Sequence, residues 1–120
     1  MLSAIRTVHI ATEPIDMRRS FDGLLASARH LGLDPYQGCC VVFLSRSRLI
    51  LKAVLGDAKG IVLICRRFEG GCLPKLVDEL LDPKVKVITQ AQMLLLFEGY
   101  TFRVSSARIP KLSIRALRIA

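Results

Sequence analysis

The sequence predicts an α+β fold: a small, mostly antiparallel sheet with two main helices packed on one face, plus a basic C-terminal arm. Three observations favour it. Short β-rich runs lie close together in the middle of the chain, two stretches have helical character, and the last residues carry Arg and Lys without any acid. A length of 120 residues with 52% hydrophobic residues suits one domain that buries its own core.

The first part of the chain predicts one strand and one helix. Val8 to Ala11 is a short β-rich run, and Glu13-Pro14 ends it. A helix over residues 20–31 is predicted by apolar residues at helical spacing: Phe21, Leu24, Leu25, Ala28 and Leu31. Gly32 suits the position after the helix end, and Asp34-Pro35 suits a turn.

The middle of the chain predicts an antiparallel meander of three strands. These strands are expected over Cys39 to Leu44, Arg48 to Leu55 and Ile61 to Arg66. The residues between the second and third runs, from Gly56 to Gly60, are typical of a turn.

The last third of the chain predicts shorter elements. Pro74 suits the first turn of a helix through Leu81, and Val85 to Ile88 suits a brief strand. Thr89 with Gln92 three residues later fits a capping box, which predicts a helix start.

The helix that begins there is expected over Gln90 to Glu98. It is apolar nearly all round, which predicts burial, and Gly99 ends it. Tyr100 to Val104 suits a closing strand. We therefore expect a single α+β domain over residues 1–104 and a basic arm over residues 105–120.

The charge of the chain predicts a polyanionic partner. The net charge is +8, and residues 99–120 hold five basic residues and no acid. The first 98 residues are nearly balanced, with 13 basic and 10 acidic residues. Nucleic acid is the first candidate partner and an anionic membrane surface is the second.

Several other classes of protein are not expected. No stretch is long and apolar enough to cross a bilayer, and no signal-peptide pattern is present, so we expect a cytoplasmic protein with no membrane partner. No P-loop, dinucleotide fingerprint or HExxH motif occurs, so no cofactor and no small-molecule substrate are expected. Zinc-site spacing is absent from the cysteines, which we expect to be buried thiols: Cys39, Cys40, Cys65 and Cys72.

The acidic residues argue against a metal-dependent nuclease, which gathers several carboxylates around its ions. No recognisable metal-ligand spacing links Asp16, Asp22, Asp57, Asp78, Glu79 and Glu98. Asp16 and Asp22 flank a helix start, where a carboxylate caps amides, and Asp57 falls in a turn. We expect no catalytic residue and no metal site, and keep a nuclease or other phosphoryl-transfer enzyme as an alternative.

Arginine recurs in clusters, and its forked guanidinium group suits phosphate oxygens. We predict that the following residues bind nucleic acid or a partner: Arg18, Arg19, Arg46, Arg48, Lys52, Arg66, Arg67, Arg108, Lys111, Arg115 and Arg118. Stacking on single-stranded bases is not expected, because the chain lacks Trp and its aromatic residues fall on predicted core positions: Phe21, Phe43, Phe68 and Phe97.

Three blocks of the sequence resemble the small accessory protein, the TnpB or ORF-2 product, of bacterial insertion-sequence-66 transposable elements. Val8 to Leu24 ends in D-M-R-R-S-F-D-G-L and is similar to the family's D-M-R-[RK]-x-F-D-G-L signature. Phe43 to Gly70 resembles its hairpin and K-R-L-E-x-G segment, and Thr89 to Gly99 its closing L-T-x-x-Q-L-x-x-L-L-E-G helix. This copy is divergent. The family usually has an acidic residue at the position of Leu49, and aromatic residues at the position of Gly56 and near those of Ile61, Ile64 and Cys65, and this sequence lacks them.

The resemblance implies a non-enzymatic accessory factor of bacterial DNA transposition, encoded beside a separate transposase. On this interpretation the chain contacts DNA with weak sequence preference, the transposase or another element-encoded protein, or both. A protein-interaction module without DNA binding, using an exposed sheet face or edge, is a further alternative.

Overall fold

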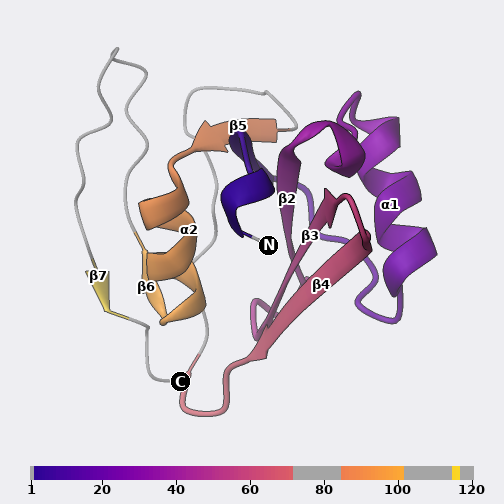
Figure 1. The fold of residues 1–120 in the computed structure, drawn as a ribbon. Coiled ribbons are helices and arrows are strands. Elements are labelled where there is room, and N and C mark those ends of the chain that lie inside the picture. The colour runs from indigo at the N-terminus through magenta and orange to yellow at the C-terminus, as the bar shows by residue number, and fades with distance from the viewer. Residues whose placement is uncertain (1, 72–84, 102–114, 117–120) are drawn as a thin grey trace.

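The computed structural model describes residues 2–71, 85–101 and 115–116 (Figure 1). Along the chain the short helical turns and helices are η1 (Leu2–Ala4), α1 (Phe21–His30), η2 (Pro35–Gln37) and α2 (Gln90–Phe97). The strands are β1 (Thr7–Ala11), β2 (Cys39–Leu44), β3 (Ile50–Asp57), β4 (Gly60–Arg67), β5 (Val85–Ile88), β6 (Tyr100–Thr101) and β7 (Arg115–Ala116).

Five strands form one mixed sheet in the order β4-β3-β2-β1-β5. The predicted meander is confirmed, because β2, β3 and β4 pair antiparallel in sequence order. β1 runs parallel to β2, with Val8 opposite Cys40, and the chain between them carries α1. β5 pairs antiparallel with the other side of β1. The α+β fold class and the mostly antiparallel sheet are therefore confirmed.

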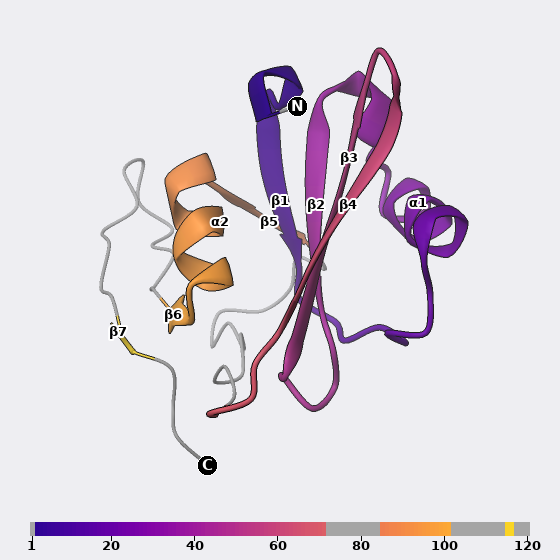
Figure 2. The same ribbon diagram turned by 60° about the horizontal axis from the view of Figure 1, so that its bottom comes forward.

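The two helices pack on opposite faces of the sheet, so the prediction that both cover one face is wrong (Figure 2). On one face Leu24 and Ala28 of α1 pack with Phe43. On the other, Met93 and Leu96 of α2 pack with a separate group of strand residues. The physical reason is the uninterrupted apolar run of β2, which buries residues on both sides as a central strand does.

The helix ends follow the sequence signals. Gly32, which follows the C-cap Leu31 of α1, has a φ of +81°, and Gly99, which follows the C-cap Glu98 of α2, has a φ of +91°. The capping box is confirmed, since Thr89 Oγ1 accepts from the Gln92 N–H at 3.0 Å and Gln92 Oε1 from the Thr89 N–H at 2.8 Å. The expected burial of α2 on all sides is wrong. Leu94 is 48% exposed, because one side of the helix contacts the sheet.

Part of the prediction falls outside the described residues. The helix expected from Pro74 to Leu81 lies there, as does most of the arm over residues 105–120. The closing strand is seen over Tyr100–Thr101, where β6 pairs antiparallel with β7. In the parts of the chain that the structure describes, no helix is long and apolar enough to span a membrane.

The turn between β3 and β4 is shorter than predicted, because β3 continues through Asp57 and β4 begins at Gly60. Asp57 closes the turn, as its Oδ1 accepts from the N–H groups of Lys59 (2.8 Å) and Gly60 (3.1 Å). Gly56 itself lies under η2. A Cβ atom at this position would be 3.0 Å from the Pro35 carbonyl oxygen and 3.1 Å from Tyr36 Cα.

Replacing Gly56 with alanine is therefore expected to destabilise the fold by about 1–3 kcal/mol, the usual cost of overpacking. The added methyl group meets backbone atoms of η2, which cannot rotate away. Urea denaturation would measure the loss. Gly70→Ala is the matched control, because a Cβ there meets nothing within 4 Å. Equal stability of the two variants would contradict the close approach of η2 to β3.

Candidate nucleic-acid interface

The signature segment around Asp16 to Phe21 lies against the start of β3 because Lys52 holds it there. Lys52 Nζ donates to the carbonyl oxygens of Met17 (2.7 Å) and Arg19 (2.9 Å), which lie 35 and 33 residues earlier. The Ile15 N–H donates to the carbonyl of Leu44 at the end of β2, at 3.2 Å. These bonds place the signature segment on the α1 face, beside the β2–β3 hairpin.

Asp16 and Arg18 form a local ion pair within this segment. Arg18 Nη2 lies 2.7 Å from Asp16 Oδ2, Arg18 Nε lies 3.0 Å from both carboxylate oxygens, and the Arg18 N–H donates to Oδ1 at 3.0 Å. Asp16 therefore closes a turn before the helix, while Ser20 occupies the N-cap of α1. The Arg18 side chain is 90% exposed, so the pair stands at the surface.

The side-chain hydrogen bond from Arg18, with help from its N–H, lowers the pKa of Asp16 from 3.8 to about 2. Because the folded value is depressed, this contact favours folding above about pH 4 and is lost as pH falls through about 2. We expect an NMR titration of the Asp16 carboxyl carbon to show the low midpoint. In Arg18→Ala the midpoint should return toward 3.8, and an unchanged midpoint would contradict the pairing.

Arg19 lies along the first turns of α1. Its Nη1 donates to Ser27 Oγ at 2.7 Å, and Ser27 Oγ donates to the Gly23 carbonyl at 2.9 Å. A Cβ atom at Gly23 would be 3.1 Å from Arg19 Cβ and 3.2 Å from its Cγ. The glycine of the signature thus leaves room for the Arg19 stem. The sequence prediction missed this role of Gly23 and Ser27, although the i to i+4 spacing of Gly23 and Ser27 was a signal for it.

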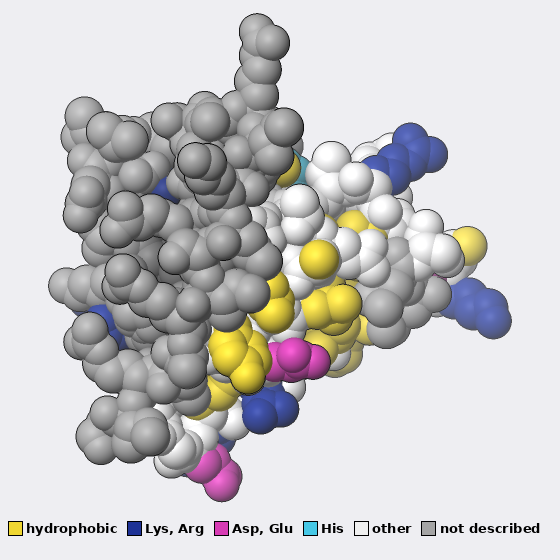
Figure 3. Space-filling model, turned by 90° about the vertical axis from the view of Figure 1, so that its left-hand side faces the viewer, with side chains coloured by type: hydrophobic (Ala, Val, Ile, Leu, Met, Phe, Trp, Pro, Cys, Tyr) yellow, Lys and Arg dark blue, Asp and Glu magenta, His cyan; other side chains and the backbone are white. Residues whose placement is uncertain are grey.

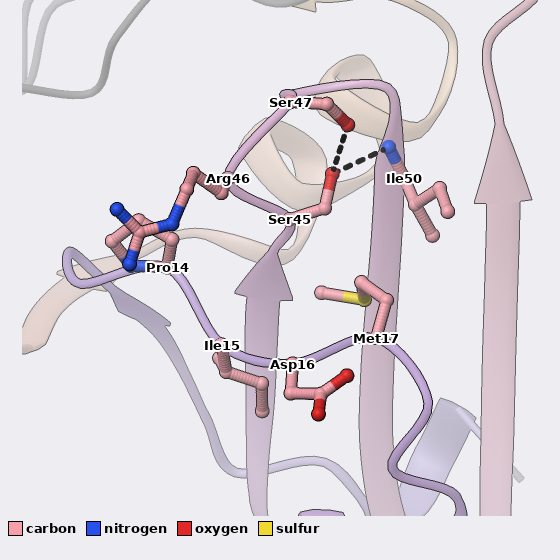
Figure 4. A pocket seen from close by; sticks show the side chains of 8 residues that line it. All are labelled: Pro14, Ile15, Asp16, Met17, Ser45, Arg46, Ser47 and Ile50. Carbon is pink, nitrogen blue, oxygen red and sulfur yellow. Dashed lines mark hydrogen bonds between the residues drawn. The ribbon is translucent and has the colours of Figure 1, made fainter.

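The hairpin between β2 and β3 faces this segment across an open cleft of about 440 Å³ (Figure 4). Arg46 is exposed at the turn. Arg48 has a φ of +62°, and among the described atoms its buried Nε has no hydrogen-bond partner. The cleft is lined by Pro14, Ile15, Asp16, Met17, Ser45, Arg46, Ser47 and Ile50.

Strand alternation separates the two arginines at the end of β4. Arg67 is opposite Ile50, which lines the cleft, so cross-strand pairing places Arg67 on the α1 face. Arg66 is opposite Leu51, which is buried in the α2-side core, and its Cζ lies 5.6 Å from the centre of the Phe68 ring. The predicted Arg66-Arg67 cluster is therefore divided between the two faces.

Four predicted binding residues thus lie on segments that meet on the α1 face near the start of β3. We call this group the hairpin-end basic surface: Arg18, Arg19, Arg46 and Arg67. On the side of the molecule where α2 lies, the described surface shows hydrophobic side chains in a band and Lys and Arg scattered singly (Figure 3). Of the arm residues, Arg115 starts β7, and Arg108, Lys111 and Arg118 lie outside the described residues.

The acidic residues do not converge where the structure describes them. No group of three His, Cys, Asp or Glu residues within the described ranges could hold a metal ion. Asp16 and Asp57 each close a turn, as expected of Asp57. Asp78 and Glu79 lie outside the described residues.

Two predictions of burial are wrong. Cys65 is exposed on the edge strand β4, whereas Cys40 is buried, which raises the pKa of its thiol to about 12. Phe21 is 48% exposed, because α1 first meets the sheet at Leu24. Phe43 and Phe68 are buried as predicted, and Cys72 lies outside the described residues.

Comparison with known proteins gives one family and one curated relative. The sequence profile of the family described as IS66 Orf2 like protein matches residues 6–107. A protein of Sinorhizobium fredii (strain NBRC 101917 / NGR234), described as uncharacterized protein y4jC, is 34% identical over 65 residues. That match covers 53% of this chain and 56% of the relative, so the chain spans just over half of the relative's length. No solved structure matches the chain significantly.

Proposed function

The chain belongs to the IS66 Orf2 like protein family, an accessory family of insertion-sequence transposition, and we propose that it assists transposition by binding DNA at the hairpin-end basic surface. The family match confirms the resemblance carried by the three sequence blocks. The DNA contact is our inference from the arrangement of the arginines.

The observation that supports it is the position of Lys52. Its two hydrogen bonds hold the segment with Arg18 and Arg19 at the start of β3. Arg46 on the hairpin and Arg67 on β4 come to the same end of the sheet. Segments far apart in the sequence thus carry arginines to one side of the sheet, and guanidinium groups suit phosphate oxygens.

The local charge balance also supports an anionic partner. Asp16 is the acid that lines the cleft, and both its oxygens already bond Arg18. Arg46 and Arg67 form no ion pair within the described part of the chain. Contacts of this type read the phosphate backbone, so we expect weak sequence preference.

The test is the affinity for duplex DNA across a range of salt concentrations. Each phosphate that the protein neutralises contributes about −0.9 to the slope of log K against log salt. Arg67→Ala should make the slope less steep by about 0.9, the contribution of one phosphate contact. Its neighbour Arg66→Ala, on the other face, should leave the slope unchanged. Both variants should unfold within about 0.5 kcal/mol of the wild type. Absent binding at low salt, or an equal effect of both variants, would refute the proposal.

A contact with an element-encoded protein is the second candidate, favoured by the position of β4 at the sheet edge. Among the described strands, β3 alone pairs with it. Its apolar residues from Ile61 to Ile64 are half-buried and alternate between the two core groups. Such an edge accepts an extended segment of a partner. Retention of the transposase after nuclease treatment, unaffected by Arg67→Ala, would support this candidate.

A further inference from the structure

We propose that the cleft between the signature segment and the β2–β3 hairpin binds one unpaired nucleotide of a DNA strand. This inference rests on the proposed function and names the form of DNA that the site takes. It also differs from the sequence prediction, which expected no binding of single-stranded bases.

The walls of the cleft carry the two chemistries that a nucleotide requires. Four of its eight lining residues are apolar, and they come from both sides: Pro14, Ile15, Met17 and Ile50. The hairpin side supplies the Arg46 guanidinium and two serine hydroxyls (Figure 4). A phosphate suits the arginine and the hydroxyls, and the flat face of a base or a sugar suits the apolar wall.

The serine pair leaves a hydroxyl proton for a ligand. Ser45 is 6% exposed, and its Oγ accepts from the Ile50 N–H at 3.1 Å and bonds Ser47 Oγ at 3.1 Å. When Ser45 donates its single proton to Ser47, the Ser47 hydroxyl keeps its own proton for an acceptor in the cleft. The bond between the two hydroxyls can run in either direction, and we infer that Ser45 donates, which leaves the exposed Ser47 as the donor to the phosphate.

The apolar lining of the cleft favours an unpaired nucleotide over a duplex. In a duplex the bases are paired and stacked, so the phosphates meet the protein while the base faces stay covered. An apolar wall within a cleft is filled when a nucleotide leaves the stack, as proteins that bind single strands exploit. Arg46 holds the backbone at the rim while Met17 and Ile50 contact the base or sugar.

The experiment compares three fluorescent probes: an oligothymidylate, a duplex of the same length, and that duplex with one extrahelical nucleotide. Wild-type protein should bind the first and third more tightly than the plain duplex. Ser47→Leu fills the cleft but keeps every charge, so it should weaken binding of these two probes about tenfold and leave duplex affinity and its salt slope unchanged. Arg66→Ala is the control, since it removes an arginine from the other face.

Each outcome bears on the proposal. Loss of the preference for unpaired nucleotides in Ser47→Leu, with duplex binding kept, supports it. Equal affinity of wild type for all three probes overturns it while the proposed duplex contact stands. Ser47→Leu with no effect, or with an equal effect on every probe, also overturns it. Absence of binding to all three probes overturns both the cleft and the proposed function.

Discussion

Replacing Phe43 with alanine is expected to destabilise the protein by about 3–5 kcal/mol. The side chain is 1% exposed and packs with Leu24, Ala28 and Val54 between α1 and the sheet. The substitution removes apolar contacts and leaves a cavity that close-packed neighbours fill poorly. Because single domains are typically stable by about 5–15 kcal/mol, the loss is a large share of the total. Chemical denaturation followed by circular dichroism would measure it.

Phe21→Ala is the matched control for this substitution. It removes the same aromatic ring from a side chain that is 48% exposed at the start of α1. We expect a change within about 0.5 kcal/mol, as for other surface substitutions. If Phe21→Ala were as damaging as Phe43→Ala, the orientation of α1 on the sheet would be wrong.

The sequence predicts the elements well where a local rule decides. The capping box at Thr89, the glycine after α1 and the three-strand meander depend on neighbouring residues, and all are present. The placement of the helices depends on distant residues. β2 is apolar at almost every position, so its pattern cannot indicate which face a helix covers. The parallel pairing of β1 with β2 likewise has no local signature.

The candidate site shows the same division. The signature block predicts that Arg18 and Arg19 lie at a helix start, and they do. Side chains alternate between the two faces along a strand, so the neighbouring positions of Arg66 and Arg67 already predict opposite faces. The prediction that they form one cluster considers only their charge. By contrast, Lys52 was predicted to contact a partner. Its bonds to Met17 and Arg19 arise from the crossing of two segments, which no local pattern reveals.

Lys52→Met tests that structural role directly, and we expect it to cost about 1–3 kcal/mol of stability. Methionine keeps the apolar stem but cannot donate to the carbonyl oxygens of Met17 and Arg19, at 2.7 and 2.9 Å. The segment that carries Arg18 and Arg19 then loses its attachment to β3. DNA affinity should fall as well, because Arg18 and Arg19 lose their position. The effect is indirect, since Lys52 Nζ bonds those two carbonyl oxygens and is not itself a DNA contact.

The structural role of Lys52 is tested by measuring both the unfolding free energy and the DNA affinity of each variant. Lys59→Met removes the same charge from the exposed β3–β4 turn, so it should leave the unfolding free energy unchanged. Arg67→Ala should lower DNA affinity without lowering stability, because Arg67 is exposed at the end of β4. Lys52→Met alone should lower both, since it acts on the DNA-binding arginines by releasing the segment that holds them. Unchanged stability in Lys52→Met, with reduced affinity, would instead make Lys52 a direct contact to phosphate.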